Sequence, residues 1–84
     1  MNYVSLVGHV RKSEQKGMVL IEINRPTMDE DANNLFIPCR YWARGEHNLL
    51  TSLKEGTMIA LRGRIDMDKD NSLFVTVENL TIIK

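Results

Sequence analysis

Five segments of the chain alternate apolar and polar residues in the way that strands with one buried face do. They cover residues 3–10, 18–24, 35–43, 57–67 and 73–83. In the first segment, Val4 and Leu6 fall on one face, and in the fourth Ile59 and Leu61 do the same. Each segment is therefore predicted to form a β-strand.

Polar stretches rich in turn-forming residues separate most of these segments. Residues 13–17 have no apolar side chain and end in Gly17, and residues 68–72 are polar throughout, so both suit hairpin turns. Residues 25–34 contain a proline and three consecutive acidic residues, which predicts a long exposed loop.

One segment has helical spacing instead. Within residues 46–53, the side chains of Leu49, Leu50 and Leu53 fall on one stripe, and Gly56 follows as a stop signal. We therefore expect one short helix between the third and fourth strands.

Five strands with a helix between the third and fourth is the order of an OB-fold, an all-β Greek-key barrel that binds oligonucleotides or oligosaccharides. An SH3-like barrel and a plain β-sandwich are alternatives, although both have less use for a helix at that position. The length of 84 residues predicts a single domain over residues 1–84. Because so small a core barely offsets conformational entropy, we also expect a homo-oligomer.

The composition narrows the choice of function. Apolar residues make up 43% and charged residues 26%, no apolar run approaches the roughly 20 residues of a membrane helix, and no signal peptide is apparent, so a cytoplasmic protein is expected. The alternation of the third strand segment points its single cysteine, Cys39, toward the core. The sequence has no further cysteine with which to form a Cys/His ligand set for zinc. His9 and His47 are isolated, so we expect no enzyme, cofactor or metal site.

The third strand segment carries aromatic and basic side chains on one face. Phe36, Arg40 and Trp42 alternate with Cys39 and Tyr41. Exposed rings can stack on bases, and guanidinium groups can contact phosphates. The spacing leaves open a structural role, in which the rings cap the barrel or fill an oligomer interface. The net charge of zero gives no overall attraction to nucleic acid.

The sequence resembles the bacterial single-stranded DNA-binding protein family in four motifs whose order and spacing match. They are NYVSLVGHV at residues 2–10, NRP at 24–26, FIPCRYW at 36–42 and GRI at 63–65. The resemblance covers Asn2 to Ile83. It implies a non-enzymatic protein that binds single-stranded DNA with little sequence preference in DNA replication, recombination or repair.

The resemblance also implies roles for particular residues. Phe36 and Trp42 would stack on bases, and seven basic side chains would contact the DNA backbone. These seven are Arg40, Arg44, Arg62, Arg64, Arg11, Lys12 and Lys16. Assembly into a homodimer or homotetramer through the first strand is implied as well.

The chain departs from the family pattern in several places. Three acidic residues surround a single lysine in residues 66–70, where the family has a basic hairpin that bears an aromatic residue, so a smaller site and weaker binding are implied. Glu22 is expected on the binding face, where it would repel phosphate. The sequence ends at Lys84 without the acidic tail of full-length members, which is similar to the dimeric primosomal replication protein N.

Two alternatives stay open at this point. The acidic stretches at residues 29–31 and 66–70 also suit an OB-fold protein-interaction subunit of a primosome-like replication complex. An RNA-binding OB module is the other alternative, because stacking does not distinguish the sugar.

Overall fold

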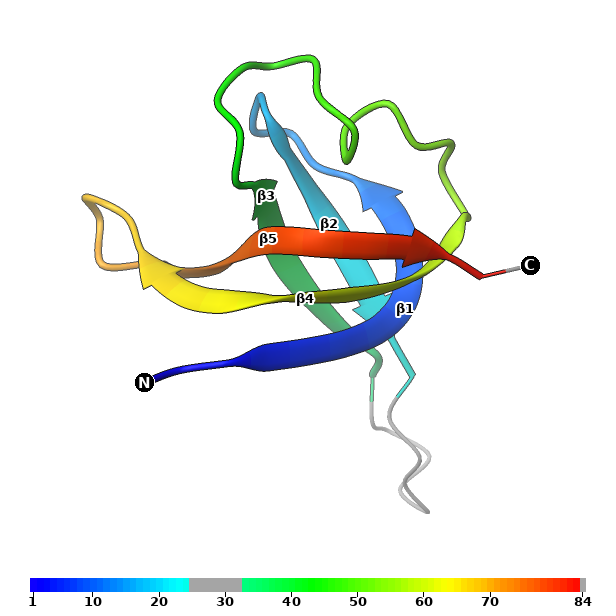
Figure 1. Cartoon of the computed structure of the whole chain (residues 1–84), viewed down its shortest axis with the longest axis horizontal. Helices are drawn as coiled ribbons and strands as arrows, with labels where there is room; N and C mark the ends of the chain where they lie inside the picture. The colour runs from blue at the N-terminus through cyan, green and yellow to red at the C-terminus, as the bar shows by residue number, and fades with distance from the viewer. Residues whose placement is uncertain (25–32, 84) are drawn as a thin grey trace.

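The alternating segments form a closed five-stranded barrel (Figure 1) in the computed structural model, which describes residues 1–24 and 33–83. The strands are β1 (Val4–Lys12), β2 (Met18–Ile23), β3 (Leu35–Tyr41), β4 (Met58–Met67) and β5 (Leu73–Ile82). Their order around the barrel is β1-β2-β3-β5-β4, with β4 pairing back onto β1. The predicted all-β OB-fold barrel is confirmed by this topology.

Strand pairing explains which residues share the outer surface. The pair β3–β5 is parallel and joins residues 39–41 to residues 75–77, whereas the other neighbours are antiparallel. Met18 on β2 lies opposite Arg40 on β3, Arg40 lies opposite Thr76 on β5, and Thr76 lies opposite Arg64 on β4. One row of outer positions therefore crosses four strands.

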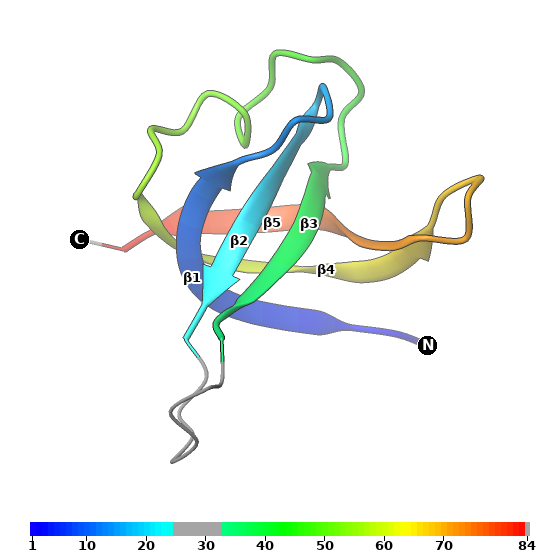
Figure 2. The same ribbon diagram turned by 180° about the vertical axis from the view of Figure 1, so that it is seen from behind.

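The helix predicted over residues 46–53 is wrong. Turns occupy this part of the chain, which Figure 2 draws as a plain loop between β3 and β4, and the described residues contain no helix. Side chains take the backbone partners that a helix would use: Asn48 Oδ1 accepts from the Thr51 N–H at 2.9 Å, and Ser52 Oγ donates to the Leu49 carbonyl at 2.8 Å. Such local bonds offer the backbone an alternative to the helix.

The leucine stripe of this segment still serves the core. Leu50 is fully buried and joins the barrel interior, whereas Leu49 is 50% exposed. Across the described residues, no helix is long and apolar enough to cross a membrane.

The core fills the inside of the barrel with side chains from all five strands and from the loop after β3. Its buried members are Val10, Val19, Ile21, Cys39, Leu50, Ile59, Leu61, Val75 and Val77. The predicted inward position of Cys39 is confirmed by its complete burial. Burial raises the pKa of the Cys39 thiol to about 12, so the thiol stays protonated and unreactive at neutral pH.

A bulge in β5 separates the partners of two arginines that lie only two residues apart on β4, because Glu78 has no partner there. The register shifts between Arg62 and Gly63, so Arg62 lies opposite Asn79 and Arg64 lies opposite Thr76. Gly63 is buried, and a Cβ there would overlap the Thr76 carbonyl oxygen and lie 2.9 Å from the carbonyl carbon. The close approach of β4 to β5 at this point thus requires glycine.

The predicted loop over residues 25–34, with its acidic residues 29–31, lies mostly outside the described residues.

Candidate nucleic-acid interface

A groove of about 640 Å³ lies on the outer surface where the β1–β2 turn, the end of β3 and the strands β4 and β5 meet. Four cationic side chains from different elements line it: Lys16, Arg40, Arg44 and Arg64. The rings of Tyr41, Trp42 and Phe74 line it as well. The barrel therefore brings rings and cations together from residues that lie far apart in the sequence.

Trp42 presents its ring to solvent at one wall of this groove. The side chain is 61% exposed, and the backbone N–H donates to the Val77 carbonyl at 2.9 Å, which holds the chain just past the end of β3. The Tyr41 ring lies 5.8 Å away, tilted by 42°, and packs partly against the core. Tyr41 thus supports the indole from the protein side and leaves it open to a ligand.

Arg40 is held over an aromatic ring. Its guanidinium carbon lies 4.8 Å from the centroid of the Phe74 ring, and its Nη2 lies 3.7 Å from the Met18 sulfur. A cation–π contact of this kind restricts the conformations of the arginine side chain and leaves its positive charge available to a ligand. Arg40 and Phe74 also line a second hollow that continues toward Lys69 in the β4–β5 hairpin.

No role is predicted for Phe74 from the sequence. Its position between Leu73 and Val75 puts it on the outer face of β5, which is the signal available in the sequence. Only the parallel pairing of β3 with β5 brings it to Arg40. The Phe74 ring lies at the base of the β4–β5 hairpin, and the tip of this hairpin has no aromatic residue.

Two carboxylates offset part of the positive charge. Asp66 accepts hydrogen bonds from the Thr76 hydroxyl and, at 3.2 Å, from Arg64 Nε, and these two contacts lower the pKa of Asp66. Glu46 lies 4.0 Å from Lys16 in an exposed pair that contributes little. Within the described parts of the chain, Arg40 and Arg44 enter no ion pair.

Glu22 lies on the outer face of β2, opposite Phe36 on β3, as expected. Its Oε2 accepts from Asn34 Nδ2 at 2.8 Å, and its Oε1 accepts from Arg11 Nε at 2.6 Å. The Asn34 amide and then the Arg11 guanidinium lower the pKa of Glu22, so this side chain is an ionised acceptor at neutral pH. The positive charge of Arg11 offsets the negative charge of Glu22.

The structure brings five of the nine predicted site residues into the groove. They are Lys16, Arg40, Trp42, Arg44 and Arg64. Phe36 is 50% exposed and lies further back along β3, roughly 13 Å from Arg40 at the rise of a strand. Arg11 is paired with Glu22, and two others line hollows other than the groove. Lys12 lines a hollow with Leu53 and Glu55, and Arg62 lies on the β1–β4–β5 surface with Ser5 and Asn79.

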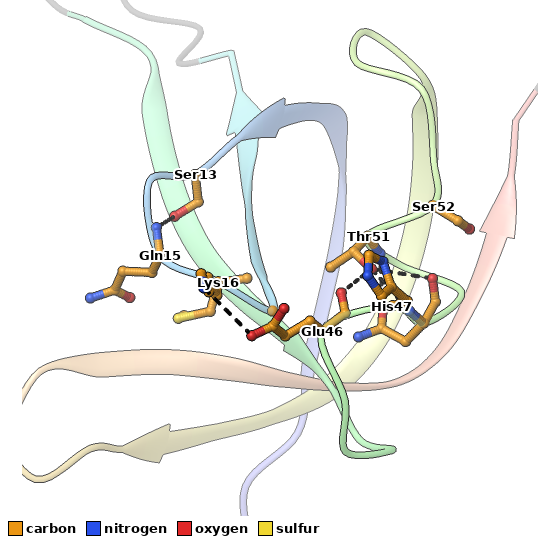
Figure 3. Close-up of a pocket in the computed structure, with 10 residues that line it drawn as sticks. Ser13, Gln15, Lys16, Glu46, His47, Thr51 and Ser52 are labelled. Carbon is orange, nitrogen blue, oxygen red and sulfur yellow. Dashed lines mark hydrogen bonds and ion pairs between the residues drawn. The ribbon is translucent and has the colours of Figure 1, made fainter.

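A polar hollow of about 570 Å³ adjoins the groove through Lys16 and Glu46 (Figure 3). Its hydroxyl groups are already used locally: Thr51 Oγ1 donates to the Glu46 carbonyl at 2.9 Å, and Ser13 Oγ accepts from the Gln15 N–H at 3.1 Å. In residues 1–24 and 33–83, no three His, Cys, Asp or Glu side chains group closely enough to hold a metal ion.

Comparison with known proteins gives structural neighbours rather than sequence relatives. No family model matches the sequence, and no curated protein matches it significantly. The mitochondrial single-stranded DNA-binding protein Rim1 of S. cerevisiae has a TM-score of 0.70 at 15% identity, with 99% of this chain and 94% of that chain covered.

Two bacterial structures are similar as well. The N-terminal domain of PriB from Thermoanaerobacter tencongensis, described as dimeric, has a TM-score of 0.60 at 22% identity, covering 99% of this chain and 97% of that chain. The second single-stranded DNA-binding protein of Mycobacterium smegmatis, SSBb, has a TM-score of 0.61 at 14% identity, covering 96% and 87%.

The fold is thus the OB-fold barrel of single-stranded DNA-binding proteins and PriB, matched over nearly the full length. The resemblance seen in the sequence is confirmed by these structural neighbours. At such low identities the likeness establishes the fold alone.

Proposed function

We propose that this chain binds single-stranded DNA with little sequence preference and catalyses no reaction, acting in DNA replication, recombination or repair. The observation that carries the proposal is the groove in which the 61%-exposed ring of Trp42 stands beside four cationic side chains. A ring offers a stacking face to any base, whereas the cations contact phosphates that every sequence shares.

The row of outer positions across the four β-strands gives the single-stranded DNA a path. Arg40 and Arg64 lie on this row on either side of Thr76, and the ring of Phe74 lies next to Arg40. Phe36 supplies a second stacking position further along β3. Bases would stack on the rings at the two ends while phosphates between them approach Arg40.

The acidic β4–β5 hairpin is compatible with this proposal because the carboxylate of Asp68 stabilises the turn itself. Asp68 Oδ1 accepts from the backbone N–H groups of Asp70 and Ser72 at 2.9 and 3.0 Å, which closes the turn. With a net charge of zero, binding depends on the local cations and weakens as salt rises.

We also propose that copies of the chain associate through β1, in the cytoplasm. Tyr3, just before β1, is 73% exposed and Val7 within it is 51% exposed, so apolar surface is available on this side of the barrel. The neighbouring PriB domain is described as dimeric. Sedimentation at micromolar concentration tests the proposal, and a monomer throughout would contradict it.

Trp42 is the single tryptophan, so its fluorescence reports directly on the proposed site. Titration with oligo-dT at low salt is expected to change the emission, and Trp42→Ala is expected to cost roughly 1–3 kcal/mol of binding when measured with a labelled oligonucleotide. Leu49→Ala is the matched control, because it removes another exposed apolar side chain, 50% against 61% for Trp42, that does not line the groove. Unchanged emission with no anisotropy change would refute the proposal.

A further inference from the structure

Among the described residues, strand pairing places a polar neighbour beside Phe36 on its β2 side only. On the β2 side its register partner is Glu22, and directly opposed side chains in a sheet have Cβ atoms roughly 5 Å apart. On its other side β3 pairs with β5 only from Cys39 onward, so β5 places no partner opposite Phe36. A flat ligand lying on the half-exposed ring therefore meets the Glu22 and Asn34 side chains at one edge.

The Glu22 carboxylate is held in place and keeps acceptor capacity. Arg11 Nε donates to Oε1 at 2.6 Å, and Asn34 Nδ2 donates to Oε2 at 2.8 Å, so each oxygen accepts one bond from the described residues. A carboxylate oxygen accepts about two hydrogen bonds, which leaves one position on each oxygen. The side chain is 18% exposed, so its edge is reachable from outside.

We propose that Phe36, Glu22 and Asn34 form a base-reading subsite that prefers guanine, which rests on the proposed binding of single-stranded DNA. The Watson–Crick edge of guanine presents two adjacent donors, N1–H and the N2 amino group, and these match two acceptor oxygens. Thymine presents one donor between two carbonyl oxygens, which an ionised carboxylate repels. Adenine and cytosine each place a ring acceptor beside their amino donor.

The acceptor oxygens of Glu22 also set the orientation of the DNA strand at this subsite. The base turns toward Glu22 on β2, where its donors find acceptors, while the backbone stays on the side where the cation Arg40 lies. Glu22 is thus a specificity-determining residue, and the family-like stacking on Phe36 becomes selective at one position of the strand.

Anisotropy of labelled oligonucleotides tests the subsite. The probes are a thymine strand, the same strand with guanine at every third position, and a third strand with hypoxanthine in place of guanine, which lacks the N2 amino donor. The guanine strand is expected to bind about five- to tenfold more tightly than the thymine strand, with the hypoxanthine strand between them.

Two variants carry the same change of charge. In Glu22→Gln the guanine preference is expected to disappear, whereas in Glu78→Gln it is expected to persist, because Glu78 is exposed on β5 and lines neither the groove nor the hollow beside Arg40 and Phe74. Phe36→Leu is expected to lose the preference, and Trp42→Leu is expected to weaken all three strands while keeping it. Thermal unfolding checks that each variant is folded.

The outcomes separate this inference from the proposed function. Equal affinity for the three strands in the parent protein, or a preference that survives Glu22→Gln, would overturn the subsite and leave DNA binding standing. Failure of every strand to bind would overturn both. A preference lost only in Glu22→Gln and Phe36→Leu would establish the subsite.

Discussion

Replacing one of two exposed arginines tests whether the groove is where DNA binds. Arg40→Gln removes a cation that lies over Phe74 in the groove, and Arg62→Gln removes one that lies on the β1–β4–β5 surface. Both variants lower the net charge by one unit. A difference between them therefore reports position and not overall charge.

The size of the effect follows from the cations in the groove. If all four contact phosphates, log affinity falls with log salt at a slope of about −2.8, because each contact to a single strand contributes about −0.7. Arg40→Gln is expected to make the slope shallower by about 0.7. If the Arg40 contact contributes nothing to affinity at about 1 M salt, its loss weakens binding roughly eightfold at about 50 mM salt.

The assay is anisotropy of a labelled oligo-dT over a tenfold range of salt. Arg62→Gln is expected to keep the slope of the parent. Because Arg40→Gln also removes the contact with Phe74, its unfolding is measured separately, with an expected loss of about 0.5–1 kcal/mol. Equal slopes for the two variants, or a change only in Arg62→Gln, would refute the placement of the site.

Three further predictions concern the scaffold. Gly63→Ala is expected to lower the free energy of unfolding by about 1–3 kcal/mol in urea titrations, because its Cβ overlaps the Thr76 carbonyl; an unchanged midpoint would contradict the close approach. The fold lowers the pKa of Asp66, so its ionised carboxylate stabilises the protein at pH values above its ordinary pKa of 3.8, and this stabilisation is lost as the pH falls below 3.8. Asp66→Asn is therefore expected to lose less stability at acid pH in thermal melts. An identical pH profile for the variant and the parent would count against this role of Asp66. Cys39 is expected to react with a thiol reagent at neutral pH only in denaturant, and rapid labelling of the native protein would contradict its burial.

The alternation of side chains was sufficient to predict the five strands and most of their inward faces, although Ile65 and Leu73, which alternate with the buried positions, are exposed at the hairpin end of β4 and β5. Ile59 and Leu61, predicted to share a face, are both buried, and so is Cys39. The OB-fold was predicted from five strands with a helix between the third and fourth, and the barrel is confirmed although the described residues contain no helix. The same reasoning failed at residues 46–53, where helical spacing of leucines competed with local side-chain bonds from Asn48 and Thr51.

The candidate site was predicted only in part because it depends on contacts between distant strands. Arg62 and Arg64 look equivalent in the sequence, but they pair with different parts of β5 on either side of its bulge and line different hollows. Phe74 reaches Arg40 only through the parallel pairing of β3 and β5. Alternation assigns a face to a residue, but it does not assign the neighbour across the sheet.

Chemical-shift mapping by NMR tests the central claim most directly in a chain of 9.7 kDa. Titration of the ¹⁵N-labelled protein with oligo-dT is expected to shift the indole N–H of Trp42 and the backbone amides of Arg40 and Phe74 most strongly. The amides of Ser5 and Asn79, on the β1–β4–β5 surface that holds Arg62, are expected to move little. The largest shifts on that surface, with the Trp42 indole unchanged, would contradict the account.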